Sequence, residues 1–361
     1  MKRVFISDCE GPISKNDNAF EITAHFVPNG GKLFTLISKY DDVLADVLKK
    51  PGYTAGSTLK LILPFLKAYG VTDAQMEEFS AQNLILIANS KDTLQHVKSV
   101  ASAFIVSTSY EHYIKALCKA VDFSYGNTYC TKLSLDKYSV TEQETLRLKE
   151  NLKEIVQMPM ITIPPEAKTL EDFPSADQET IKRLDTIFWR DIPDMSVGGI
   201  LSEVTTVGGS QKAAAIEDAT TKVKVPLEDV MYVGDSITDV EAFKLVRENG
   251  GLTVSFNGNG YAVRNAEISV LSENNLVTAV LADVFCRKGK QAALNLVENW
   301  NLESLEHNGV VSLSLLDHLF TLHPQTLPKV QIVTEENMET VTKKSSEFRK
   351  KVRGEAIGKL G

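Results

Sequence analysis

The 361-residue sequence has little of what would tie a chain to an oxidising compartment, a zinc site or a membrane. Its four cysteines are far apart and form no CxxC pair, which excludes a disulfide framework and a zinc-finger pattern. The first ten residues contain acids and no signal-peptide core. The richest apolar stretch, LKLILPFLKAYG, is too short to span a bilayer. We therefore expect a cytoplasmic protein without membrane insertion.

The sequence also lacks an excess of positive charge. Its formal net charge is -8, which argues against a nucleic-acid partner because such binding needs a basic face. Basic residues gather only in the last 21 positions, 341–361, where seven Lys or Arg stand against two Glu. A solvated C-terminal helix is the favoured interpretation of this tail, and contact with an acidic partner or a phosphate is the alternative.

Short β-branched runs alternate with segments of helical spacing. The runs are Val4–Ser7, Ala103–Ser107, Val230–Gly234, Leu252–Phe256 and Ile268–Leu271. The helical segments between them include Thr93–Val100, Glu111–Ala120, Gln211–Lys222 and Asp239–Glu248. This alternation predicts an α/β fold with a Rossmann-like parallel sheet that helices cover on both faces. Ligands of such sheets collect beyond the carboxyl ends of the strands.

Three segments interrupt or follow this alternation. Residues 15–89 are mostly helical in pattern and predict a cap, which leaves 1–14, 90–134 and 197–300 for the core. Residues 135–196 predict a second insertion, with amphipathic helices that suit either another lid or an oligomer surface. Residues 301–361 predict a C-terminal helical appendage.

Carboxylate, hydroxyl and amine side chains stand at the ends of three predicted strands and at one helix start. Carboxylate oxygens suit Mg²⁺, which takes one or two carboxylates and keeps several waters. An amine and a hydroxyl stabilise phosphoryl oxygens, and a carboxylate can attack phosphorus. The sequence therefore predicts a site for a phosphate ester and a divalent cation. The residues are Asp8, Glu10, Ser107, Thr108, Lys212, Asp235 and Asp239.

The order of these motifs resembles that of the haloacid dehalogenase-like superfamily. The segments DCEG, FIVSTS, GGSQK and YVGDSITD follow one another as the four motifs of that family do. The phosphoserine phosphatase branch is the nearest, because it shares the serine motif, the GDSxxD form and an asparagine after the next strand, here Asn257. The resemblance covers about half of the chain. It implies an Mg²⁺-dependent phosphatase that acts through an aspartyl-phosphate.

The resemblance also implies roles for single residues. Asp8 matches the nucleophile, and Glu10 matches the acid that protonates the leaving oxygen and then activates water. Asp8, the backbone carbonyl of Glu10 and Asp235 match the metal ligands. Asp239, which also fits a helix N-cap, matches the acid that supports a metal-bound water or the lysine. The matches for phosphate or substrate contact are Ser107, Thr108, Lys212 and Asn257.

Three of these matches have alternatives. Thr108 or Ser109 can replace Ser107 as the hydroxyl that binds the phosphate. Lys212 also fits an ordinary surface lysine at a glycine-led helix start. Asn257 fits the turn chemistry of NGNG as well as it fits a ligand.

The sequence departs from the family pattern next to Asp8. Most members have Asp where Glu10 stands, and the added methylene moves the carboxyl by about an ångström, a shift that can cost on the order of a hundredfold in rate. Pro12 follows Gly11 where the family has Thr, and proline donates no N–H. Glu21 lies too far along the chain to match the substrate-reading glutamate of phosphoserine phosphatases, which argues against phosphoserine as the substrate.

Three functions fit these observations. The first is a phosphatase for a small phosphorylated metabolite, because a large cap favours small substrates. The second is a catalytically weak or inactive accessory subunit of a larger complex, which Glu10, Pro12 and the long appendages favour. The chain also faintly resembles an archaeal branch of the superfamily that has been linked to a membrane-bound hydrogenase. The third is a phosphotransferase with the same residues and another acceptor. A homo-oligomer is compatible with each.

Overall fold

In the computed structural model, which describes residues 3–307 and 309–360, the strands form one sheet in the order β3-β2-β1-β4-β5-β6-β7. Neighbouring strands are parallel except for the β6–β7 pair, which is antiparallel. The predicted α/β class with a Rossmann-like parallel sheet is therefore confirmed. The strands are β1 (Val4–Ser7), β2 (Ser102–Tyr110), β3 (Thr128–Thr131), β4 (Val230–Gly234), β5 (Leu252–Phe256), β6 (Ile268–Leu271) and β7 (Lys329–Ile332).

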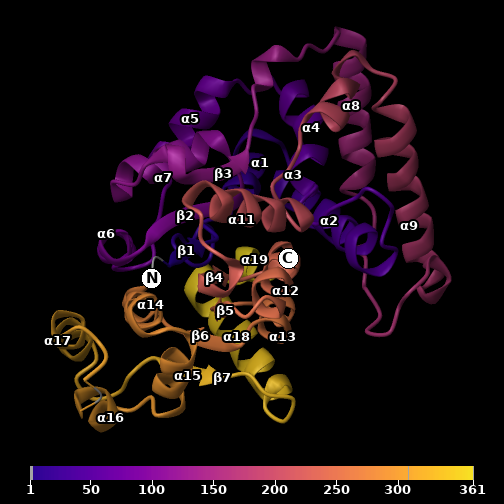
Figure 1. Cartoon of the computed structure of the whole chain (residues 1–361). Coiled ribbons are helices and arrows are strands. Elements are labelled where there is room, and N and C mark those ends of the chain that lie inside the picture. The colour runs from indigo at the N-terminus through magenta and orange to yellow at the C-terminus, as the bar shows by residue number, and fades with distance from the viewer. Residues whose placement is uncertain (1–2, 308, 361) are drawn as a thin grey trace.

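Helices cover both faces of this sheet (Figure 1), and a hydrophobic core lies on each face. Side chains alternate along β1, so that Phe5 packs into one core while Val4 and Ile6 pack into the other. The first core contains residues of α6 (Ser90–Val100), α7 (Glu111–Val121), α14 (Leu276–Lys288) and α15 (Lys290–Glu298). The second contains residues of α11 (Ser210–Val223), α12 (Val240–Glu248) and α13 (Gly260–Asn265).

The two insertions pack together into one helical cap. Both contribute to a third hydrophobic core, in which Ile37 of the first insertion and Phe188 of the second are buried. The indole N–H of Trp189 also donates to the hydroxyl of Tyr40 at 2.8 Å. The first insertion holds α1 (Asn18–Phe26), α2 (Gly30–Asp42), a π-helix (Val43–Val47), α3 (Thr58–Leu61), α4 (Leu63–Ala68) and α5 (Asp73–Gln82). The second holds α8 (Glu142–Ile155), α9 (Ser175–Thr186) and a π-helix (Ile187–Asp191), and α10 (Ile200–Glu203), which follows it, contributes to the same core.

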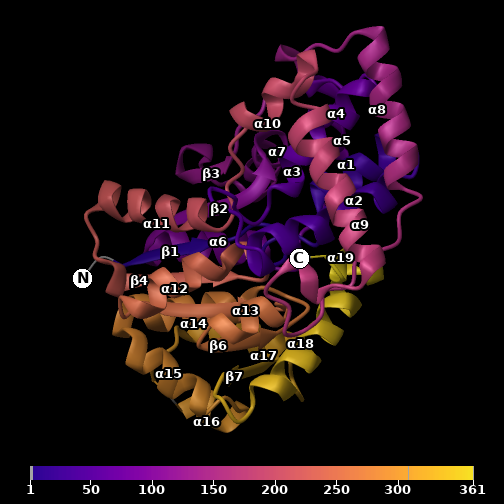
Figure 2. The same cartoon turned by 90° about the vertical axis from the view of Figure 1, so that its right-hand side faces the viewer.

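The C-terminal segment connects the sheet to the cap. Its elements are α16 (Leu302–His307), α17 (Leu313–Leu322), β7, α18 (Met338–Arg353) and α19 (Glu355–Gly358). Figure 2 shows α18 and α19, in yellow, at the border between the sheet and the cap helices. Leu360 ends this path in the hydrophobic core of the cap. Within residues 3–307 and 309–360, none of the helices has both the length and the apolar composition to cross a bilayer.

A buried carboxylate fastens part of the C-terminal segment to the core. Asp283 of α14 accepts hydrogen bonds from His96 of α6 at 3.1 Å and from the backbone N–H of Ser312 at 2.9 Å, and it pairs with Arg287. Burial alone would raise the pKa of Asp283, but these donors prevail and lower it from 3.8 to about 2. The carboxylate therefore stabilises the fold above about pH 4, and this stabilisation is lost as the pH falls towards 2.

We expect Asp283→Asn to lower the free energy of unfolding by about 2 kcal/mol at pH 7, because three donors lose a charged acceptor. Urea denaturation at pH 7 and pH 3 measures the effect, and the difference from the wild type should shrink at pH 3. Asp317→Asn, at an exposed position of α17, is the control and should change stability by less than about 0.5 kcal/mol. Equal differences at both pH values for Asp283→Asn would contradict this assignment.

Candidate active site

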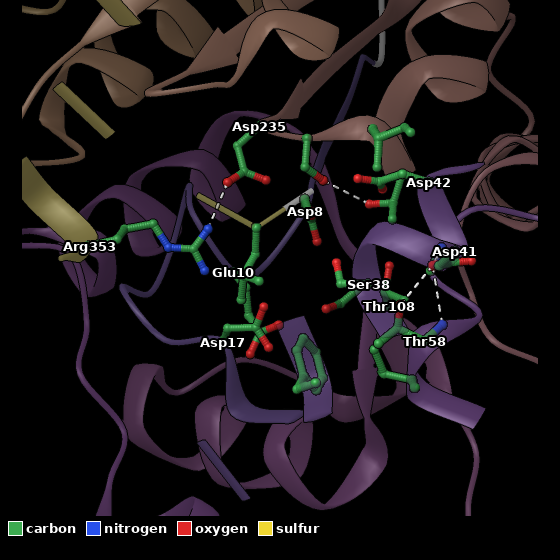
Figure 3. Close-up of a pocket in the computed structure, with 18 of the residues that line it drawn as sticks. Asp8, Glu10, Asp17, Ser38, Asp41, Asp42, Thr58, Thr108, Asp235 and Arg353 are labelled. Atoms are coloured by element: carbon green, nitrogen blue, oxygen red, sulfur yellow. Dashed lines mark hydrogen bonds and ion pairs between the residues drawn. The ribbon is translucent and has the colours of Figure 1, made fainter. Parts of the chain in front are cut away.

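The acids at the ends of β1 and β4 meet at the point where the strand order reverses. Asp8 follows β1, and its backbone N–H donates to Val233 of β4 at 2.8 Å. Asp235 follows β4 directly, and Asp239 stands one turn further along. One carboxylate oxygen from each of these three buried residues lies within 4.8 Å of the others (Figure 3 labels Asp8 and Asp235). This edge of the sheet is where ligands of doubly wound sheets bind.

Lys212 is the buried cation between two of these acids. It belongs to the first turn of α11, and its Nζ lies 2.7 Å from both Asp8 Oδ2 and Asp239 Oδ1. Its side chain is 0% exposed, so the surface-lysine alternative is wrong. Burial opposes the charge, but the two carboxylates prevail and raise the pKa of Lys212. Burial also raises the pKa of Asp8 to about 7, with Asp239 and Asp235 adding to the effect of burial and Lys212 opposing it.

Asp239 holds the loop and the lysine. Its Oδ1 accepts from Lys212 at 2.7 Å and from the Tyr232 hydroxyl at 2.6 Å. Its Oδ2 accepts from the backbone N–H groups of Asp235 and Ser236, both at 2.9 Å. The Ser236 hydroxyl also donates to Oδ2, at 3.4 Å, so each oxygen already accepts at least two hydrogen bonds. Of the roles that the sequence left open, support of the lysine fits these contacts better than direct contact with a cation or its water.

The hydroxyl groups at the end of β2 differ in their contacts. Ser107 Oγ donates to Ser109 Oγ at 3.1 Å and accepts from the backbone N–H of Ser109 at 3.2 Å. The hydroxyl of Thr108 is buried, and nothing in the described part of the chain hydrogen-bonds to it. Both Ser107 and Thr108 line the cavity beside Asp8. Thr108 is thus the hydroxyl with unused hydrogen-bonding capacity for a phosphoryl oxygen.

Glu10 reaches from the core to the cap. Its Oε1 accepts from the backbone N–H of Asn18 at 2.6 Å, at the start of α1. Burial raises the pKa of Glu10 well above its usual range, and Asp17 adds to this effect while the Asn18 N–H opposes it. A raised pKa favours the protonated carboxyl, which is the state that a general acid needs. The extra methylene thus carries the carboxyl to the first cap helix.

The cap closes directly over these residues. Gly56 has a φ of +89°, and a Cβ on it would lie 2.8 Å from the side chain of Thr108. Gly11 has a φ of +104°, and a Cβ there would lie 2.0 Å from Asp235 Oδ2. The cavity that remains measures about 90 Å³, well below the 300–1,000 Å³ of a typical small-molecule cleft. Its cap residues include Phe34, Ser38, Asp41, Asp42 and Thr58.

The structure adds two arginines of α18 that the sequence analysis missed. Arg349 binds Asp235 through Oδ2 and the backbone carbonyl, and Arg353 lies 3.0 Å from the same Oδ2. Their side chains are only 3% and 4% exposed, so the prediction of a solvated C-terminal helix is wrong for both. The i, i+4 spacing of Ser345, Arg349 and Arg353 is the signal that could have placed them on one buried face.

The remaining oxygens fit a magnesium ion. Both arginines bind Oδ2 of Asp235, and among the described residues no hydrogen bond or ion pair reaches Oδ1. Asp8 faces it across the three-acid cluster. Carboxylate oxygens of this kind are the ligands that Mg²⁺ prefers, and one or two of them suffice. Asp8 and Asp235 are therefore the side chains that could hold the cation.

Asn257 does not contact this cavity. Its Nδ2 donates to the carbonyl of Ser272 at 2.7 Å, and its Oδ1 accepts from the N–H of the same residue at 3.0 Å. Its φ of +48° is that of a left-handed turn residue. The predicted substrate contact is wrong for this structure, because Ser272 occupies both ends of the amide, and the turn alternative fits.

Comparisons with known proteins agree with this fold. A family model described as haloacid dehalogenase-like hydrolase matches residues 57–283. A solved gene product from Archaeoglobus fulgidus is 25% identical, covering 100% of this chain and 99% of its own, with a TM-score of 0.79. A substrate-bound phosphoserine phosphatase is 12% identical, covering 76% of this chain and 95% of its own, with a TM-score of 0.44. No curated protein matches the chain.

Proposed function

The chain belongs to the haloacid dehalogenase-like hydrolases, and from that premise we propose that it is an Mg²⁺-dependent phosphatase acting on a small phosphorylated metabolite. The observation that carries this proposal is the meeting of Asp8, Thr108 and Asp235 at one cavity, with Lys212 in contact with Asp8 at 2.7 Å. These four residues come from three strand ends and one helix start. A cytoplasmic location is part of the proposal, since all four cysteines are free thiols.

The residues divide the proposed reaction between them. A carboxylate oxygen of Asp8 attacks phosphorus, the bond from phosphorus to the leaving oxygen breaks, and Glu10 donates its proton to that oxygen. Lys212 and Thr108 donate hydrogen bonds to the phosphoryl oxygens. In the second half, water attacks the phosphorus of the aspartyl-phosphate while Glu10 takes up a proton. Phosphate leaves, and Asp8 is restored.

The metal belongs to the proposal as a ligand of these residues. Asp8, Asp235 and the backbone carbonyl of Glu10 would hold Mg²⁺. When bound, the ion supplies positive charge that offsets the negative charge of the phosphoryl oxygens. Asp239 would hold Lys212 in place, because it bonds both to the lysine and to the loop after β4.

The size of the cavity limits the substrate. A volume of about 90 Å³ suits a phosphoryl group with few further atoms while the cap is closed. Entry of a larger metabolite therefore requires the cap to move, as lids over active sites commonly do. A protein-bound phosphate is too bulky for this closed geometry, which supports a small metabolite.

A panel of phosphorylated metabolites and one aryl phosphate tests the proposal. With Mg²⁺ we expect phosphate release from at least one compound at about 1–10³ s⁻¹, as for typical enzymes. Chelation with EDTA should abolish the release, and added Mg²⁺ should restore it. An absence of turnover on every compound, together with a stable partner in a pull-down, would favour the accessory-subunit alternative. Phosphate transfer to an added alcohol in place of release would favour the phosphotransferase.

A further inference from the structure

The buried ion pairs of the site form a network with equal numbers of acids and bases. Lys212 bridges Asp8 and Asp239, while both arginines of α18 pair with Asp235. All six side chains are at most 7% exposed. The acids are Asp8, Asp235 and Asp239, and the bases are Lys212, Arg349 and Arg353.

The two arginines change the formal charge of the network to which a cation would bind. Without them the network would carry three carboxylates and one ammonium, a charge of -2 that matches a divalent cation. With them the formal charge is zero. A divalent cation alone would then give these six residues an excess of +2, and uncompensated buried charge is costly. A phosphate dianion carries the charge that cancels this excess.

The geometry allows the arginines and a cation to contact Asp235 together. The arginines use Oδ2, which leaves Oδ1 on the same carboxylate. Arg353 is also tied by its Nε to the carbonyl of Lys15 at 3.0 Å, and its Nη2 donates to the carbonyl of Asn16. These carbonyls lie where the chain leaves the core for the cap. The guanidinium groups are thus fixed parts of the site.

Four further acids line the cavity, and each has a donor outside the network. Glu10 accepts from the N–H of Asn18, and Asp17 accepts from the N–H of Phe20 at 3.0 Å. Both bonds lie at the N-terminus of α1, whose partial positive charge stabilises acids. Asp41 accepts from the N–H groups of Gly56 and Thr58, and Asp42 pairs with Lys39 at 2.9 Å.

Arg349 also lines the cavity, and its buried Nε has no hydrogen-bond partner among the described residues. A donor of this kind favours an anion over a lone cation.

We propose that Arg349 and Arg353 make the binding of the divalent cation and of the phosphate dianion mutually dependent. Each ligand binds weakly alone, and each strengthens the binding of the other by the same factor, as linkage requires. This inference deepens the proposed function, because it uses the same cation and phosphate positions. It assigns to the C-terminal helix a role in preventing occupation of the site by a metal without substrate or product.

Titration of the full chain with Mn²⁺, followed by electron paramagnetic resonance of the unbound ion, measures the dependence without turnover. Inorganic phosphate, kept below its precipitation limit and corrected with a protein-free titration, should tighten Mn²⁺ binding about 10-fold or more. Mn²⁺ should tighten phosphate binding by an equal factor. Wild-type affinity for Mn²⁺ that does not change with phosphate would overturn the proposal.

Two double variants distinguish the effect of the two buried arginines from the effect of losing any two positive charges. In R349M/R353M we expect Mn²⁺ alone to bind about 10-fold more tightly than in the wild type, and phosphate to change that affinity less than about 3-fold. K343M/K344M removes the same charge from exposed positions of the same helix and should behave like the wild type. Equal behaviour of the two variants would overturn the proposal.

The design also keeps this inference apart from the proposed function. If R349M/R353M does not fold, as judged by circular dichroism, the wild-type titrations decide alone. Turnover on the metabolite panel without any dependence between Mn²⁺ and phosphate would leave the phosphatase proposal standing and reject this one. Mutual dependence of Mn²⁺ and phosphate binding without any turnover would support this inference and reject the phosphatase proposal.

Discussion

Replacement of Asp8 by Asn is expected to lower kcat by a factor on the order of 10⁴ or more on any phosphate ester that the wild type hydrolyses. The amide has the shape of the carboxylate but cannot form the acyl phosphate. It also removes the anion that faces Lys212 at 2.7 Å. Phosphate release under saturating substrate and Mg²⁺ measures the loss.

The control for Asp8→Asn is a carboxylate-to-amide change outside the site. Asp317→Asn lies at an exposed position of α17 and should keep kcat within about twofold, as surface substitutions usually do. Circular dichroism of both variants checks that the fold is intact. Retention of a tenth or more of the wild-type rate in Asp8→Asn would exclude Asp8 as the nucleophile.

Two substitutions of Glu10 are expected to distinguish its role as a proton donor from its hydrogen bond to the cap. Glu10→Gln keeps an oxygen for the Asn18 N–H but has no proton to give, so kcat for an alkyl phosphate should fall by about 10²–10⁴. The fall should be smaller for an aryl phosphate, whose leaving oxygen needs less protonation. Glu10→Asp keeps the proton and loses the reach to Asn18, and we expect it to retain more activity than Glu10→Gln.

The pH profile gives this prediction a second readout. Because burial raises the pKa of Glu10, the acid keeps its proton to a higher pH than an ordinary glutamate and loses it as the pH rises through that higher value. The rate for the alkyl ester should therefore decline on the alkaline side, at a pH above the ordinary range of a glutamate. Glu10→Gln should lack this decline. An unchanged profile in Glu10→Gln would assign the proton transfer to another group.

The predicted site residues that the structure brings together are those whose positions depend on local pattern. Asp8 and Asp235 directly follow buried β-branched runs, and parallel strands bring their carboxyl ends to one edge. Lys212 was predicted from its place at a glycine-led helix start and from the resemblance, but such a start does not by itself bury a lysine, so the surface alternative stayed open. β3 and β7 were missed because the four-residue segments TYCT and KVQI lack a continuous apolar run.

Features that depend on distant contacts could not be predicted. Arg349 lies 114 residues from Asp235 in the sequence, and a basic amphipathic helix is more often solvated than inserted into a site. The departure at Glu10 also gained its explanation only from the structure. Its partner Asn18 begins a helix of the cap, and no sequence rule placed that helix start over the strand end.

The central claim, that Asp8 becomes phosphorylated, is tested most directly by trapping the intermediate. Sodium borohydride reduces an acyl phosphate to an alcohol, so protein quenched during turnover with Mg²⁺ and substrate should carry homoserine at position 8. Peptide mass spectrometry locates the change, and protein treated without substrate is the control. The account predicts homoserine at position 8 only in the turnover sample. Unmodified Asp8 in a sample that releases phosphate, or a modification at another carboxylate, would contradict it.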